Sequence, residues 1–212
     1  MNRLLRWIFT LCVAYPVVLV WLGVSVWQRK QLPLKGPAIV VANHNSHLDI
    51  LTLFTLFPLS TLSHVHPVAA ADYFLRNRAI AWFAIKVIGI IPVTRGGAAK
   101  GSDPLAGCIE ALSNNKIVIL FPEGTRGEPE KFSEFKSGLW YLSRQFPSVP
   151  ITPVYMHGLG RAMGKGQRIP VPFFIDIYVD KPFYFHDDKQ IFRTELQQRF
   201  IALQQLATRK MP

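Results

Sequence analysis

Cysteine is scarce in this chain of 212 residues, which contains only Cys12 and Cys108. Two thiols cannot build the disulfide framework of a small secreted domain, so a domain that faces the cytosol is the simplest interpretation. Charged side chains are also few, at 17% of the chain against 50% hydrophobic residues. This balance excludes an intrinsically disordered chain, because disorder requires low hydrophobicity and high net charge. The length is that of one ordinary domain, with room for a short appendage.

Acidic residues are under-represented, because 13 Asp and Glu stand against 24 Lys and Arg and leave a formal net charge of +11. The first 100 residues contain ten of the basic residues but only two acids, Asp49 and Asp72. Such an excess favours an anionic partner: nucleic acid, a phospholipid surface, or a phosphorylated or acidic substrate. The chain has neither basic residues interleaved with aromatics nor a known nucleic-acid-binding module, so we expect no nucleic acid and favour a membrane. The mean hydropathy of +0.20 agrees with that choice.

An uncharged run of 21 residues extends from Trp7 to Trp27. A helix of about 20 apolar residues crosses the hydrocarbon core, and terminal tryptophans favour the interface. A cleaved signal peptide is the alternative, but the run is long and no A-x-A-like site follows it. Pro16 kinks such a helix, so the segment either spans the bilayer or lies in one leaflet as a bent hairpin. We predict an uncleaved membrane anchor over residues 1–30 and one domain over residues 31–212.

Short apolar runs alternate with helical patterns along the rest of the chain. The expected strands cover residues 38–42, 67–71, 90–93, 117–121, 151–156 and 173–179. The expected helices cover residues 48–57, 72–89, 137–146 and 187–207, with one more that starts at Asp103. This alternation indicates an α/β domain with a largely parallel sheet flanked by helices. In such sheets chemistry takes place beyond the carboxyl ends of the strands, so polar clusters directly after strands are candidate sites.

The first polar cluster follows the strand at 38–42 and reads Asn-His-Asn-Ser-His-Leu-Asp over residues 43–49. Across a strand-to-helix turn, Asp49 can fold back toward His44. A carboxylate on Nδ1–H fixes the imidazole tautomer and raises the basicity of Nε2, which produces a general base for a hydroxyl group. A histidine that only caps the helix or satisfies a core hydrogen bond is the structural alternative.

Histidine pairs also raise the question of a metal site. His44 and His47 are three residues apart, and His64 and His66 are two apart. Neither pair belongs to an H-E-x-x-H pattern or stands near a cysteine pair. We therefore expect no metal ligands.

The second cluster is Phe-Pro-Glu-Gly-Thr-Arg-Gly at residues 121–127, after the strand at 117–121. Gly124 permits a tight turn and close approach of a ligand. The planar fork of Arg126 matches a phosphate or a carboxylate. Glu123 either accepts a ligand hydroxyl or holds Arg126 in place. A surface turn with a local ion pair is the structural alternative.

Four clusters in this order resemble the glycerolipid acyltransferase family, in particular its bacterial 1-acylglycerol-3-phosphate acyltransferases. The family blocks match the N-H-x-x-x-x-D pattern at 43–49, Gly89 with Arg95, F-P-E-G-T-R at 121–126, F-K-x-G at 135–138, and the proline-containing strand entry at 149–154. The resemblance covers about residues 36–160. The second block departs from the family, because Pro92 stands where a bulky aromatic is usual.

The resemblance implies a fold like that of glycerol-3-phosphate acyltransferase and assigns roles to individual residues. His44 is expected to be the general base and Asp49 its partner. The acceptor oxygen then attacks an acyl thioester directly, in agreement with the lack of a G-x-S-x-G nucleophile elbow. Arg95 and Arg126 are expected to hold the acceptor phosphate. Three neighbours belong to the same acceptor site: Glu123, Gly124 and Thr125.

The implied reaction transfers a fatty acyl group from acyl-CoA or acyl-carrier protein to the sn-2 hydroxyl of 1-acylglycerol-3-phosphate, giving phosphatidic acid. The expected partners are a phospholipid membrane, lysophosphatidic acid and the acyl donor, which is a co-substrate; no cofactor is expected. The anchor predicts the inner (cytoplasmic) membrane, with the catalytic domain facing the cytosol. Three alternatives stay open: another lysophospholipid or lyso-aminolipid acceptor, a non-catalytic lipid-binding protein on the same fold, and a metal-dependent hydrolase.

Overall fold

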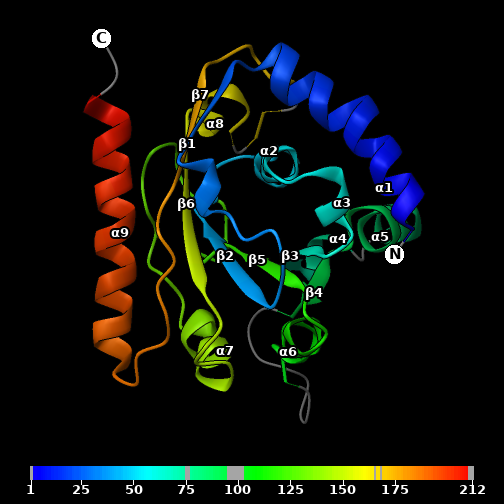
Figure 1. Ribbon diagram of the computed structural model, residues 1–212. Helices are drawn as coiled ribbons and strands as arrows, with labels where there is room; N and C mark the ends of the chain where they lie inside the picture. Colours follow the sequence, from blue (N-terminus) through cyan, green and yellow to red (C-terminus); the bar gives the residue numbers. More distant parts are fainter. Residues whose placement is uncertain (1, 75–76, 95–102, 165, 168, 210–212) are drawn as a thin grey trace.

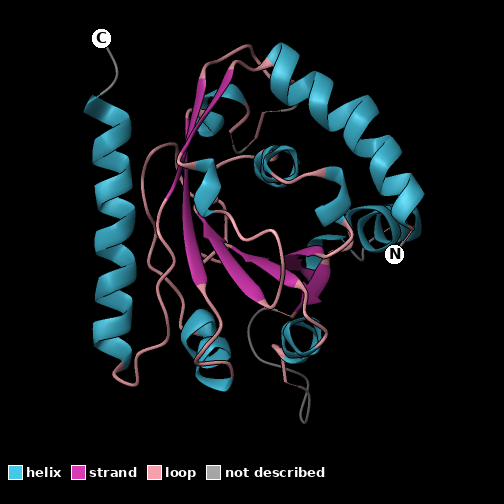
Figure 2. Ribbon diagram, in the orientation of Figure 1, coloured by secondary structure: helices cyan, strands magenta, loops and turns pink. Residues whose placement is uncertain are grey.

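A seven-stranded mixed sheet with helices on both faces forms the centre of the chain, which is described here by a computed structural model (Figure 1, Figure 2). The structure describes residues 2–74, 77–94, 103–164, 166–167 and 169–209.

The sheet has the strand order β1-β7-β6-β2-β5-β3-β4. Neighbouring strands run parallel, except that β6 and β7 are antiparallel. The strands are β1 (Val24–Trp27), β2 (Ala38–Ala42), β3 (Val65–Ala70), β4 (Ile91–Val93), β5 (Ile117–Leu120), β6 (Ile151–His157) and β7 (Ile175–Val179). The predicted α/β fold with a largely parallel sheet is confirmed.

The helices cover both faces of this sheet (Figure 2). They are α1 (Arg3–Phe9), the π-helical η1 (Thr10–Ala14) and η2 (Pro16–Trp21), the 3-10 turn η3 (Arg29–Gln31), α2 (Asp49–Leu56), α3 (Leu59–Leu62), α4 (Ala71–Phe74), α5 (Arg78–Phe83), the π-helical η4 (Ala84–Ile88), α6 (Ala106–Ser113), α7 (Gly138–Gln145), α8 (Leu159–Ala162) and α9 (Lys189–Arg209). The helix predicted over residues 72–89 is wrong as a single element. Asn77 caps a separate helix, because its side chain accepts hydrogen bonds from the backbone of Ala79 and Ile80.

Strand β2 lies at the middle of the sheet, and all five of its residues are buried. Because side chains alternate along a strand, Val40 and Ala42 enter the core on the face covered by α2. Ile39 and Val41 enter the core on the opposite face, which α7 and α9 cover. Burial on both faces explains why this strand is a continuous apolar run in the sequence rather than an alternating one.

The apolar amino-terminal run does not form one helix over residues 7–27, so that prediction is wrong at its carboxyl end. A helical segment extends from Arg3 to Trp21 and is long and apolar enough to cross a membrane by length and composition. Pro16 lies where η1 gives way to η2, because proline lacks the N–H that a continuous helical ladder requires. The chain then becomes extended, and β1 pairs with β7 at the edge of the sheet. The division at residue 30 stays a prediction, although β1 lies before it.

One stripe of the amino-terminal helix is buried against the domain. Its members recur every four residues and are Arg6, Thr10, Ala14, Val18 and Leu22. The helix contacts α2 along η1 and η2, and it contacts η4 along α1. The segment therefore packs along its length on the domain.

Arg6 fastens this helix to the domain from the inside. Its side chain is fully buried, and its guanidinium lies 5.2 Å above the ring of Phe54. The guanidinium N–H groups donate hydrogen bonds to the carbonyl oxygens of Leu62, Val65, Val87 and Ile88. Burial lowers the pKa of Arg6 to about 10, which keeps the side chain charged at neutral pH. Arg6, which directly precedes the uncharged run in the sequence, is thus an internal anchor.

Replacing Arg6 with alanine is expected to lower the free energy of unfolding by about 3 kcal/mol, because it leaves buried carbonyl groups without a donor. Urea denaturation in mild detergent measures the change. Arg3 is exposed on the same helix, and Arg3→Ala is expected to change the free energy by less than about 0.5 kcal/mol. Equal effects of the two substitutions would contradict the buried-anchor role.

Candidate active site

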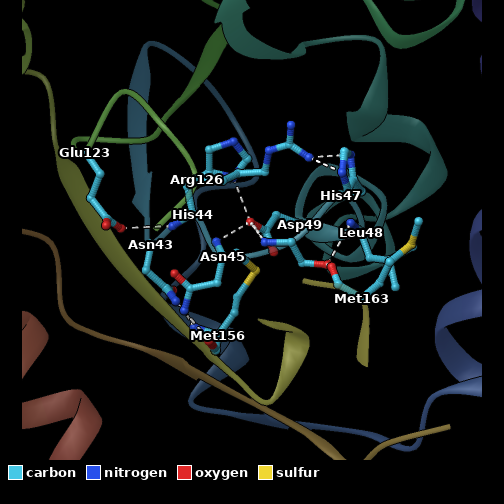
Figure 3. Close-up of polar contacts among 11 residues, drawn as sticks. Asn43, His44, Asn45, His47, Leu48, Asp49, Glu123, Arg126, Met156 and Met163 are labelled. Carbon is cyan, nitrogen blue, oxygen red and sulfur yellow. Dashed lines mark hydrogen bonds and ion pairs between the residues drawn. The ribbon is translucent and has the colours of Figure 1, made fainter. Parts of the chain in front are cut away.

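The turn between β2 and α2 carries the first polar cluster (Figure 3). Its first residue, Asn43, is buried and clamps the turn to the neighbouring strand β6. The Asn43 Nδ2 group donates to the Met156 carbonyl at 2.9 Å, and Oδ1 accepts from the Met156 N–H at 2.7 Å. This pair fixes where the chain leaves the sheet.

Asp49 closes the turn from its other end. Its Oδ2 atom lies 2.7 Å from His44 Nδ1 and accepts from the backbone N–H groups of Asn45 at 2.9 Å and Ser46 at 3.0 Å. The carboxylate is buried, so these hydrogen bonds replace the water that it loses. The expected fold-back of Asp49 onto His44 is confirmed. With Nδ1–H directed at Asp49, Nε2 is left as the basic nitrogen of the His44 ring.

His44 is held on three further sides by the loop that follows β5. Its N–H donates to Glu123 Oε1 at 3.0 Å, and its carbonyl accepts from Gly127 N–H at 2.9 Å. The imidazole stacks on the ring of Phe121, with centroids 4.2 Å apart and planes 23° apart. The ring is 20% exposed and lines a pocket. Nε2 is therefore the nitrogen that a substrate can reach.

Glu123 braces the backbone of the site. It is 1% exposed, and its second oxygen, Oε2, accepts from the Ser133 N–H at 2.9 Å. Burial raises the pKa of Glu123, while the hydrogen bonds from Ser133 and His44 oppose that shift. Both carboxylate oxygens are thus engaged by main-chain donors. Its assignment to acceptor binding stays a prediction.

Arg126 extends over the turn and contacts the ring nitrogens of His47 (Figure 3). Burial and the Arg126 charge lower the pKa of His47, so its ring is neutral at neutral pH and accepts from Arg126. Lys136 lines the same pocket as Arg126. Gly124 turns the loop here with a φ of 70°, a conformation that strains any residue with a Cβ. The sequence did not indicate the contact between His47 and Arg126.

A pocket of about 480 Å³ opens beside His44. Its polar wall contains His44, Ser46, His47, Asp72, Arg126 and Lys136. Its apolar wall contains Ile50, Val68, Ala69, Ala70, Val93, Leu105, Leu120, Phe121, Pro122 and Leu139. A lining that combines basic side chains with many apolar ones suits an amphiphilic molecule with an anionic group.

Three of the remaining candidates are placed as follows. Arg95 lies outside the described residues, so its expected phosphate contact stays a prediction. Thr125 is exposed on the loop. His66 Nδ1 is 2.9 Å from the Gly89 carbonyl. Within the described residues, no group of three or more His, Cys, Asp and Glu is arranged to hold a metal ion.

A further carboxylate, Glu130, is partly buried behind the turn and carries no sequence signal. Its Oε2 accepts from the Tyr155 hydroxyl at 2.8 Å and lies 2.6 Å from His157 Nδ1, and its Oε1 accepts from Gly158 N–H at 2.9 Å. Burial raises the pKa of Glu130, but these neighbours outweigh it and hold the pKa below its usual value. When the Asn45 side-chain amide is oriented so that its nitrogen donates to the His44 carbonyl at 3.0 Å, its oxygen accepts from the Glu130 N–H at 3.3 Å. Glu130 therefore joins the end of β6 to the His44 turn.

Comparison with known proteins places this geometry in a family. The model of the family described as Acyltransferase matches residues 23–157, which include β1 and both loops of the site. The chain belongs to the acyltransferase family. The resemblance to glycerolipid acyltransferases seen in the sequence is confirmed.

Curated relatives carry the name 1-acyl-sn-glycerol-3-phosphate acyltransferase. The chloroplastic protein BAT2 from Brassica napus is 28% identical over 77% of this chain and 48% of its own length. The Saccharomyces cerevisiae protein is 32% identical over 72% of this chain and 49% of its own length. The chain thus spans about half the length of these relatives.

A solved structure supports the fold independently. The crystal structure of the 1-acyl-sn-glycerophosphate (LPA) acyltransferase PlsC from Thermotoga maritima matches with a TM-score of 0.77. The match covers 98% of this chain and 81% of that chain at 21% sequence identity. At this identity the likeness shows the fold alone, and it confirms the predicted fold class.

Replacing Glu123 with glutamine is expected to lower the free energy of unfolding by about 2 kcal/mol, because an amide N–H then faces a backbone donor. Urea denaturation measures this loss. Glu128→Gln is the matched control, since Glu128 forms an exposed ion pair with Lys131, and it is expected to cost less than about 0.5 kcal/mol. Unchanged stability of Glu123→Gln together with a raised KM for the acceptor would show a ligand-binding role instead.

Proposed function

We propose that the chain transfers a fatty acyl group from a thioester, acyl-CoA or acyl-carrier protein, to the sn-2 hydroxyl of 1-acylglycerol-3-phosphate, giving phosphatidic acid. One observation carries the proposal. His44 is held by Asp49 through Nδ1, which leaves Nε2 available, and it lines a pocket that combines basic and apolar side chains. The names of the curated relatives support the same reaction.

The chemistry follows from the orientation of His44. Nε2 removes the proton of the acceptor hydroxyl while the oxygen attacks the thioester carbonyl. The new C–O bond forms, the C–S bond breaks, and the leaving thiolate takes the proton back from the imidazolium. Asp49 stabilises that imidazolium through Nδ1–H, as the carboxylate does in a Ser-His-Asp triad. The substrate hydroxyl occupies the place of the serine, so no acyl-enzyme is required.

Binding of the acceptor follows from the two kinds of side chain that line the pocket. Arg126 and Lys136 supply positive charge for the acceptor phosphate, and Arg126 offers two parallel donors to it. Neutral His47 orients Arg126 without adding charge of its own. The apolar wall, which includes Ile50 and Val68, accommodates an acyl chain.

Replacing His44 with alanine is expected to reduce kcat by about 10²–10⁴-fold, since a positioned general base contributes that much. Acyl transfer is measured in detergent from acyl-CoA and from acyl-carrier protein to 1-acylglycerol-3-phosphate and to other lysolipids. His64→Ala is the matched control, because His64 contacts Lys116 outside the pocket.

The outcomes separate the alternatives. Activity with another lysolipid alone would keep the mechanism and change the acceptor. Full activity of His44→Ala would overturn the assigned base. No transfer to any lysolipid by folded protein would favour a lipid-binding protein.

We further propose that the helix from Arg3 to Trp21 attaches the enzyme to the inner face of the cytoplasmic membrane, with the helix lying in one leaflet. The buried stripe occupies one side of the helix, so a spanning orientation would pull it off the domain. The opposite side exposes apolar residues that suit a lipid interface: Leu4, Ile8, Leu11, Val13, Leu19, Val20 and Trp21. The net charge of +11 favours the anionic cytoplasmic leaflet.

Labelling of Cys12 tests this attachment. Cys12 is exposed on the helix, whereas Cys108 is buried and its thiol pKa is raised to about 12. In a Cys108→Ser protein, anionic vesicles are expected to slow the reaction of Cys12 with a water-soluble maleimide by about tenfold or more. A Gln205→Cys protein without the two native thiols is the control, because Gln205 is exposed on α9 and should react equally with and without vesicles. An unchanged rate for Cys12 would contradict the proposed orientation.

A further inference from the structure

The helical segment formed by α5 and η4 exposes apolar side chains that the acyl-transfer chemistry does not use. Ile80 is 50% exposed, Trp82 is 53% exposed, and Phe83 and Ile85 are each 38% exposed. Four large apolar residues are thus exposed on one short segment, and Trp82 and Ile85, three residues apart, lie on the same side of the helix. Exposed apolar residues concentrated in this way mark an interaction surface. We refer to these four residues as the α5–η4 patch.

Basic residues precede and follow the α5–η4 patch residues on the same segment. Arg78 and Lys86 are exposed on the same segment, and the sequence has no acidic residue between Asp72 and Asp103. Basic residues around tryptophan and branched apolar side chains are typical of helices that lie at the surface of an anionic bilayer. Indole rings also favour the headgroup level of a membrane.

The α5–η4 patch continues the exposed face of the amino-terminal helix. The rings of Phe9 and Phe83 meet edge to face with centroids 5.1 Å apart. The Asn2 N–H donates to the Lys86 carbonyl at 2.8 Å. Figure 1 shows α5 beside the amino-terminal end of α1. A leaflet that receives the amino-terminal helix therefore also meets the patch.

The segment also lies, in the sequence, between two strands that line the pocket. It follows β3, whose residues Val68, Ala69 and Ala70 line the apolar wall, and it precedes β4, whose Val93 lines the same wall. Seating the segment on a bilayer therefore brings the side of the pocket formed by β3 and β4 toward the lipid surface. An acyl chain then passes between bilayer and pocket with little exposure of its methylene groups to water.

We propose that the α5–η4 patch is a second membrane-contacting surface, which rests in the headgroup region of an anionic leaflet. It acts together with the amino-terminal helix and turns the side of the pocket formed by β3 and β4 toward the bilayer. This inference rests on the membrane attachment proposed above, but it assigns the contact to different residues.

Vesicle binding by the full chain tests the patch. The patch variant is Ile80→Ser, Trp82→Ser and Ile85→Ser, which leaves the packed ring of Phe83 in place. The matched variant is Ile191→Ser, Ile201→Ser and Leu206→Ser on α9, whose side chains are 51%, 47% and 42% exposed. Helix α9 lies across the sheet from α1 and α5 (Figure 1).

On vesicles of phosphatidylcholine and phosphatidylglycerol, the patch variant is expected to bind about tenfold or more weakly than wild type, and the α9 variant within about twofold of it. Wild-type binding is also expected to weaken on pure phosphatidylcholine and at high salt. Equal binding of the patch variant and wild type would overturn the proposal.

Tryptophan quenching gives a second measurement that does not depend on the folding of the patch variant. Brominated lipids are expected to quench wild-type fluorescence more than that of Trp82→Phe, because Trp82 lies at headgroup depth. Equal fractional quenching of both proteins would overturn the proposal. A dimer that dissociates in the patch variant, with vesicle binding unchanged, would assign the patch to a second copy of the chain and overturn it as well.

Acyl transfer in detergent separates this inference from the proposed reaction. The patch variant is expected to keep wild-type kcat on detergent-dispersed substrate and to lose activity on vesicle-borne substrate. The wild type could fail to transfer an acyl group while the patch variant still binds vesicles weakly. That result would support the membrane-contacting surface and contradict the proposed reaction.

Discussion

The Asp49 carboxylate is the point on which the site depends. A single oxygen, Oδ2, receives the His44 ring and the backbone N–H groups of Asn45 and Ser46, all within 3.0 Å. The same residue begins α2, where a negative charge is favoured by the helix dipole. One buried charge therefore sets the conformation of the turn, the start of a helix and the tautomer of the imidazole. Removing it would leave several donors unsatisfied at once.

The sheet supplies the supports around that charge. Strand β2 lies between β6 and β5, so the carboxyl ends of three parallel strands meet at His44. The loop after β5 uses Glu123 and Gly127 to hold the His44 N–H and carbonyl, and β6 uses Met156 to hold Asn43. His44 is thus fixed by backbone geometry that is itself buried, which keeps its ring in place without help from a ligand. The buried guanidinium of Arg6 performs the corresponding task for the amino-terminal helix.

Local sequence patterns predicted much of the fold and of the His44 site. The features that they did not predict depend on contacts between residues far apart in the sequence. A buried β-branched run followed by a polar turn and an apolar helix predicted β2, α2 and the meeting of His44 with Asp49. Strand β1 was missed because its residues continue the apolar run of the helix before it, and only pairing with β7, about 150 residues later, makes it a strand. The brace formed by Glu123 and the contacts of Glu130 also escaped prediction. Their partners lie on other elements, and a carboxylate that holds backbone has the same sequence signature as one that holds a ligand.

The tautomer of His44 tests the account most directly. Nitrogen NMR of protein labelled with ¹⁵N-histidine, with the His44 signals assigned from a His44→Gln variant, reports which ring nitrogen carries the proton. The account predicts a protonated Nδ1 and an unprotonated Nε2 in the neutral wild-type ring, and loss of that preference in Asp49→Asn. A wild-type ring protonated at Nε2, or a spectrum unchanged by Asp49→Asn, would contradict the claim that this carboxylate makes His44 a base.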